Sequence, residues 1–205
     1  MNLKPLALGA AMALSALSMP AMADDDHKRP RFTLSSPDLD SGKFTNHFVL
    51  NAFGCAGDNV SPELVWKNPP AGTQSFALQV YDPDAPTGSG FWHWAVYDIP
   101  ATATGLARGA GNSPATLPTG AYGGNTDFMD TGATGVNGNY GGPCPPVGDK
   151  PHRYIFTLFA VAVPSVQAAG GIPSTGSAAL YGFVLNEGLG AALLGTASFT
   201  ATYGR

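Results

Sequence analysis

The chain has 205 residues, with 10 Lys and Arg against 14 Asp and Glu, and 44% of its residues are hydrophobic. Its formal net charge of −4 argues against the basic surface on which nucleic acid binding depends, so nucleic acid is not an expected partner. The length is enough for one globular domain with a sizeable core.

Residues 1–23 have the pattern of a secretory signal peptide. Lys4 is the only charge, an apolar run extends from Leu6 to Leu17, and the small residues Ala21 and Ala23 flank Met22. The run is shorter than the roughly 20 residues of a membrane-spanning helix, although an uncleaved anchor is the alternative. We expect cleavage after Ala23, no transmembrane anchor, and a periplasmic or secreted protein.

Beyond the signal peptide, we expect a solvated tail and entry strand over residues 24–34 and a single domain over residues 35–205. The 27 Gly and 18 Pro residues separate short β-rich runs, which favours a mainly β fold. The candidate strands, in chain order, are Arg31–Ser35, Leu64–Trp66, Ser75–Tyr81, His93–Ile99, Tyr154–Val163 and Ala197–Tyr203.

Two of these runs also indicate where the strands lie in the sheet. In "SFALQVYD", Phe76, Leu78 and Val80 alternate onto one face. The run "YIFTLFAVAV" is apolar on both faces, which is typical of a strand covered on each side.

One segment, Ser174–Leu194, has a helical pattern. Ser174 or Ser177 is the expected N-cap. The apolar stripe consists of Ala178, Leu180, Tyr181, Val184 and Leu185.

The stretch from Leu106 to Gly142 has no periodicity and is rich in Gly, Asn and Thr. Loops of this length inside a compact domain are usually functional or disordered. We interpret it as a wall or lid beside a site.

The chain contains two cysteines, Cys55 and Cys144, in turn-rich segments. In an exported protein the expected state is a disulfide between them, and two free thiols are the alternative.

The segment "YDPDAPTGSGFWHWAVYDIP" (81–100) brings together Asp82, Asp84 and His93. The aspartates could simply be turn residues that accept hydrogen bonds from nearby amides. In the functional interpretation, Asp82 hydrogen-bonds His93 and raises its pKa. Strand alternation places His93 on the same face as Phe91 and Ala95, and both neighbouring tryptophans on the other face.

A second segment, "GGPCPPVGDKPHRYIFTLFAV" (141–161), repeats this layout of prolines, a glycine and a histidine where a strand begins. His152 and Tyr154 would share a face, and Arg153 would point the opposite way. A lone strand histidine is more often structural. We expect Arg153 to form a buried ion pair with Asp84, because a guanidinium that enters a β domain needs a carboxylate.

Together with "CAGDNVSPELVW" (55–66), these segments resemble the phosphatidylethanolamine-binding proteins, in particular their bacterial Raf-kinase-inhibitor-like branch. The resemblance implies a large central antiparallel sheet packed with a smaller sheet, plus short helical segments near the C-terminus. It also implies a small surface pocket for anionic groups. The residues carried over to that pocket are Asp82, Pro86, His93, Pro146, Gly148, His152 and Tyr154.

The resemblance therefore predicts a binding protein without a cofactor or metal, whose ligand is a phosphate, a phosphorylated headgroup or a carboxylate. One alternative is a secreted protease or kinase inhibitor that acts on a partner protein through a pocket-independent interface. Another is a hydrolase with Asp82 and His93 as a dyad, although no serine or cysteine lies in a nucleophile motif. A homodimer is a further alternative.

Overall fold

The computed structural model describes residues 30–205, and in this part the chain forms two antiparallel sheets. The expected signal peptide and residues 24–29 of the expected tail lie outside the described residues. The strands are β1 (Thr33–Ser35), β2 (Leu64–Lys67), β3 (Ser75–Asp82), β4 (Phe91–Pro100), β5 (Gly105–Leu106), β6 (Tyr122–Gly123), β7 (His152–Val161) and β8 (Leu193–Tyr203). No helix within residues 30–205 combines the length and apolarity required to cross a membrane.

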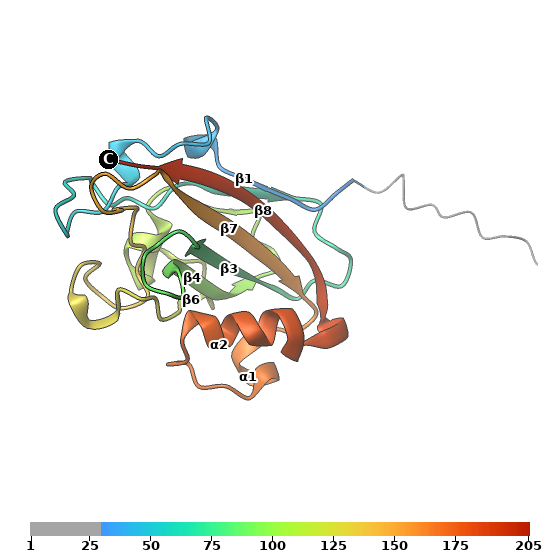
Figure 1. Cartoon of the computed structure of the whole chain (residues 1–205). Helices are drawn as coiled ribbons and strands as arrows, with labels where there is room; N and C mark the ends of the chain where they lie inside the picture. Colours follow the sequence, from blue (N-terminus) through green and yellow to red (C-terminus); the bar gives the residue numbers. More distant parts are fainter. Residues whose placement is uncertain (1–29) are drawn as a thin grey trace, which may run out of the picture.

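The larger sheet has five strands in the order β6-β4-β3-β7-β8, and the smaller sheet has three in the order β1-β2-β5. Figure 1 shows β4, β3, β7 and β8 side by side, with α1 (Val166–Gly170) and α2 (Ala178–Phe183) against one face. Because β3 lies at the centre and is covered on both faces, nearly all of its residues are buried. The mainly β fold expected from the sequence is confirmed.

The smaller sheet covers the opposite face of the larger one. Leu34 and Trp66 of the small sheet belong to the same buried cluster as Phe76, Leu78 and Val80 of β3. The predicted face of β3 is therefore confirmed.

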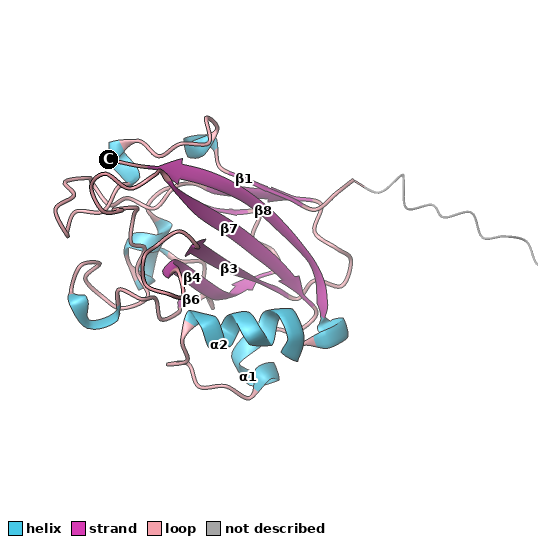
Figure 2. Cartoon of the chain, in the orientation of Figure 1, coloured by secondary structure: helices cyan, strands magenta, loops and turns pink. Residues whose placement is uncertain are grey.

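The helical face is held by a second buried cluster. Ser177 is the N-cap of α2, and its hydroxyl oxygen accepts a hydrogen bond from the backbone N–H of Leu180. Tyr181 packs into this cluster with Tyr97 and Phe159 from the sheet. In Figure 2 the two helices lie together beside the sheet, and loops surround much of the remaining edge.

The predicted helical segment at 174–194 is present but shorter. It consists of α2, a π-helical turn (Val184–Gly188) and, after Leu189, a 3-10 turn (Gly190–Ala192), and Leu193 already belongs to β8. Leu180, assigned to the apolar stripe, is 38% exposed. Helix α1 was not predicted at all, because five residues are too few for a periodic pattern.

The predicted disulfide is present between Cys55 and Cys144. It joins two loops that are 89 residues apart in the sequence. These loops border the cavity described next.

Candidate functional site

The first structural feature of the site is a β-bulge that changes the direction of His93. Between β3 and β4, Val80 lies opposite Trp94 and Tyr81 lies opposite Trp92, which leaves His93 as an extra residue without a counterpart. A bulge of this kind interrupts the alternation of side chains along a strand.

The interruption places two consecutive side chains on one side of the sheet. The imidazole of His93 contacts the ring of Tyr154, with centroids 5.0 Å apart, and Trp94 belongs to the same small-sheet core as Tyr154. Ala95, in contrast, belongs to the helix-side cluster. The expectation that His93 and Ala95 share a face, with Trp94 on the other, is therefore wrong.

A buried carboxylate and a buried histidine form the polar floor of the site. Asp82, at the end of β3, is 2% exposed, and His152, at the start of β7, is 3% exposed. Asp82 Oδ2 lies 2.7 Å from His152 Nδ1 and 4.0 Å from His93 Nε2. Asp82 therefore hydrogen-bonds His152, and the predicted hydrogen bond between Asp82 and His93 is not formed.

The hydrogen bonds of the two histidines determine which ring nitrogen carries the proton. His93 Nδ1 lies 2.9 Å from the carbonyl oxygen of Gly141, which can only accept, so Nδ1 is the protonated nitrogen. His152 Nδ1 faces the carboxylate of Asp82 and is protonated for the same reason. In the neutral ring of His93, Nε2 is left as an acceptor, whereas Nε2 of His152 lies 3.4 Å from a second carboxylate oxygen, Asp149 Oδ2.

Burial also changes the acidity of two groups in the site. Desolvation lowers the pKa of His93 below 6.5, although the Gly141 carbonyl and the charge of Asp82 oppose this effect. The expected increase in the pKa of His93 is therefore wrong. Burial raises the pKa of the Tyr154 phenol, so its hydroxyl stays protonated.

The Tyr154 hydroxyl is buried and has no hydrogen-bonding partner in the described part of the chain. A buried hydroxyl without a partner is energetically costly. In a native structure it calls for an explanation, and an absent ligand or water is one.

These groups line a cavity of about 160 Å³. Six of the seven predicted pocket residues line it, namely Asp82, Pro86, His93, Pro146, His152 and Tyr154. Gly148 does not line it, although its positive φ of 90° helps to turn the loop that follows Pro146.

Much of the remaining wall is apolar, and its residues were not among those predicted from the sequence. Phe53, Phe91 and Phe128 all line the cavity. Phe128 contacts His93 edge to face, with ring centroids 5.4 Å apart. The available sequence signals were that Phe91 lies within the segment 81–100 and that Phe53 lies two residues before the segment 55–66.

The long stretch from Leu106 to Gly142 supplies part of this wall through Phe128 and Gly142. A side chain at Gly141 would collide with the ring of Phe128, and one at Gly142 would collide with the carbonyl oxygen of Phe48. The close approach of the loop to the cavity therefore requires glycine at both positions.

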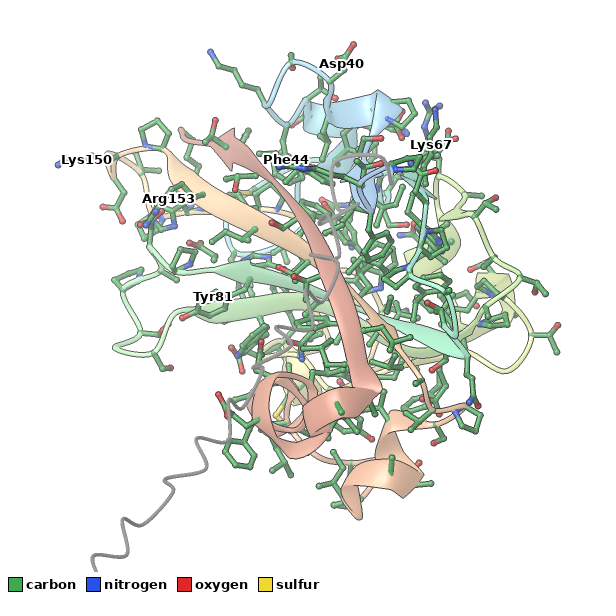
Figure 3. The ribbon with its side chains drawn as sticks, turned by 90° about the vertical axis from the view of Figure 1, so that its right-hand side faces the viewer. Asp40, Phe44, Lys67, Tyr81, Lys150 and Arg153 are labelled. Carbon is green, nitrogen blue, oxygen red and sulfur yellow. A yellow bond between two sulfur atoms is a disulfide. The ribbon has the colours of Figure 1, made fainter. Side chains whose placement is uncertain are left out.

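Asp84 and Arg153 form the predicted ion pair beside the pocket, with Arg153 Nη2 2.7 Å from Asp84 Oδ1. The pair is not buried as predicted, because the side chains of Arg153 and Asp84 are 56% and 31% exposed. Figure 3 shows Arg153 at the edge of the molecule, in the same region as Lys150. The hydrogen bonds and charge of Arg153 lower the pKa of Asp84 to about 2.

Among residues 30–205, no group of three or more His, Cys, Asp or Glu side chains is placed to hold a metal ion. The chemistry available at the site consists of the carboxylate of Asp82, two imidazoles, one phenol and an aromatic wall.

The family model described as "Phosphatidylethanolamine-binding protein" matches residues 40–204. The chain therefore belongs to the phosphatidylethanolamine-binding protein family.

Two proteins of Escherichia coli (strain K12) are among its relatives. YbcL is 45% identical over 174 residues, which cover 84% of this chain and 87% of YbcL. YbhB is 43% identical over 151 residues, which cover 73% of this chain and 88% of YbhB.

The crystal structure of E. coli YbcL, described as a new member of the mammalian PEBP family, has the same fold. The two structures superimpose with a TM-score of 0.72 at 44% identity, covering 85% of this chain and 98% of YbcL.

Proposed function

We propose that this protein binds a small anionic group, a phosphate-like group or a carboxylate, in the cavity floored by His93, His152 and Tyr154. The observation that carries the proposal concerns Tyr154, a residue of the cavity wall whose buried hydroxyl has no hydrogen-bonding partner in residues 30–205. A ligand oxygen that accepts from this hydroxyl would remove the cost of leaving it unpaired.

Protonation of His93 would complete the receptor. In the neutral ring His93 Nε2 is an acceptor, and two carboxylates disfavour an incoming anion: Asp82, and Asp149 at 3.4 Å from His152 Nε2. Protonation converts His93 Nε2 into a donor and adds a positive charge. Anion binding is therefore coupled to proton uptake, and a phosphate monoester can also bring a proton of its own.

We further propose that the protein acts in the periplasm or outside the cell. The signal peptide pattern of residues 1–23 and the disulfide between Cys55 and Cys144 support this location, because disulfides persist in oxidising compartments.

Calorimetric titration with methanesulfonate between pH 8 and pH 5 tests the proposal, because the charge of a sulfonate is constant over this range. We expect affinity to increase as the pH falls below 6.5, since the lowered pKa of His93 places its protonation on the acid side of that value. His93→Gln should weaken binding at pH 5 and flatten the profile, and His152→Gln should weaken binding.

His47→Gln is the matched control, because His47 is paired with Asp58 and its side chain is 44% exposed. This variant should keep the wild-type profile. A pH-independent affinity in the wild type, or a profile unchanged in both pocket variants, would show that the two histidines are structural.

A further inference from the structure

Phe53 occupies a turn that suits its side chain poorly. The backbone N–H of Cys55 donates to the carbonyl oxygen of Ala52 over 2.9 Å, which closes a four-residue turn. Both central residues have positive φ, 53° at Phe53 and 81° at Gly54. Turns of this kind favour Gly, Asn or Asp, and a bulky aromatic residue is strained there.

The strain is not compensated by burial of the side chain. Phe53 is 59% exposed, and its ring stacks on that of Phe128, with centroids 6.3 Å apart and planes 7° from parallel. Stability alone would favour Asn at this position. Strained residues that persist in this way are concentrated at functional sites.

Two cross-links hold the turn in place. The disulfide at Cys55 ties it to Cys144, which lies in the loop that contains Pro145. The guanidinium of Arg205 joins the same two loops, donating from Nη1 to the Gly54 carbonyl over 2.8 Å and from Nε to the Pro145 carbonyl over 2.6 Å. The backbone that carries the exposed ring is thus held in place.

That position is at the cavity. Phe53 lines the same cavity as His93, and Phe128 contacts both rings. Because His93 is 6% exposed and Phe53 is largely exposed, a ligand whose anionic end reaches the polar floor extends past Phe53 toward solvent.

We propose that Phe53 is a stacking platform and that the ligand is an aryl anion, with a flat ring next to its anionic group. The inference rests on the proposed function, because it needs the anion to be bound at the polar floor. It adds a specificity-determining residue, Phe53, and a ligand class.

Three sulfonates of equal charge test the proposal at pH 5.5. Benzenesulfonate carries a flat ring, cyclohexanesulfonate an apolar ring that is not flat, and methanesulfonate almost no apolar body. We expect benzenesulfonate to bind about fivefold more tightly than cyclohexanesulfonate, the ratio that an aromatic stacking contact typically supplies.

The variant Phe53→Asn removes the ring and fits the positive φ, so its thermal stability should equal or exceed that of the wild type. It should abolish the preference for benzenesulfonate over cyclohexanesulfonate, whereas Phe53→Trp should retain the preference. Phe183→Asn is the matched control, because Phe183 on α2 is 63% exposed and does not line the cavity.

Equal affinity of the wild type for the two cyclic sulfonates, or a preference that persists in Phe53→Asn, would overturn the stacking proposal while anion binding stood. If none of the three sulfonates binds, the proposed function and the stacking proposal both fail.

Discussion

The two sides of the large sheet each contain buried tyrosines, and they differ in how their hydroxyls are satisfied. On the helical side, the Tyr97 hydroxyl accepts from Gln79 Nε2 over 3.0 Å, and the Tyr181 and Tyr122 hydroxyls share a hydrogen bond of 2.9 Å. On the pocket side, the Tyr140 hydroxyl donates to the Phe48 carbonyl oxygen over 2.8 Å, whereas the Tyr154 hydroxyl has no partner within residues 30–205. Tyr154 therefore differs from the other four tyrosines in having an unused hydroxyl.

The difference separates two roles for the same residue type. A buried polar group that is fully hydrogen-bonded contributes to a unique packing, whereas one that is left open costs free energy until something binds. Burial alone therefore does not separate these two kinds of tyrosine, whereas the number of hydrogen-bonding partners of the hydroxyl does.

The largest expected effect on stability is on the pocket side, where loops rather than strands form much of the cavity wall. The double variant Cys55→Ser, Cys144→Ser should lower the free energy of unfolding by about 4 kcal/mol, because it frees a long loop in the unfolded chain. Urea denaturation of the oxidised protein measures this.

Reductant supplies the control for the disulfide. The wild type should lose comparable stability when it is reduced, and the double variant should not respond. Two titratable thiols in the denatured, unreduced wild type would contradict the disulfide itself.

The second prediction compares two conservative changes at buried tyrosines. Tyr97→Phe removes the acceptor of the Gln79 amide and should destabilise the protein by about 1 to 2 kcal/mol without changing anion affinity. Tyr154→Phe removes a hydroxyl that has no described partner, so stability should stay within about 0.5 kcal/mol of wild type or rise, whereas anion affinity should fall about tenfold.

Thermal denaturation and calorimetric titration of both variants provide the two readouts. A loss of stability in Tyr154→Phe as large as that in Tyr97→Phe would remove the distinction between the two sides of the sheet.

The smallest expected effect concerns the exposed ion pair of Asp84 and Arg153. Since the folded-state pKa of Asp84 is about 2, against an ordinary value of 3.8, the pair stabilises the protein above pH 3.8 and ceases to do so as the pH falls through 2. Exposed pairs are screened by solvent, so Arg153→Met should lower the melting temperature at pH 7 only slightly.

Melting temperatures of the wild type and Arg153→Met at pH 7 and pH 2 measure this contribution, and the gap between them should narrow at pH 2. A large decrease in the melting temperature of Arg153→Met at pH 7 would show that the pair stabilises the protein as much as a buried ion pair does.

The sequence was sufficient to predict the strands that have strong apolar patterns. The predicted runs around Phe76 and Phe156 correspond to β3 and β7, because long buried strands consist mostly of apolar residues. Strands β5 and β6 have two residues each and leave no pattern to read.

The sequence predicted most of the residues that were expected to share a cavity, but it did not predict the hydrogen bonds among them. Six of the seven predicted pocket residues line one cavity, yet Asp82 pairs with His152 rather than His93. The reason is geometric, since side-chain partners depend on how strands lie next to each other. The wall formed by Phe53 and Phe128 was missed because nothing local distinguishes a cavity-lining phenylalanine from a core one.

The bulge at His93 makes the pocket depend on the number of residues in β4 as well as on their identity. His93 is the one residue without a counterpart between the pairs of Trp92 with Tyr81 and Trp94 with Val80. An in-frame loss of a single codon at this position would restore regular pairing on both sides while deleting the imidazole from the pocket. A relative that lacks this codon would keep the architecture and lose the imidazole on which the proposed anion binding depends.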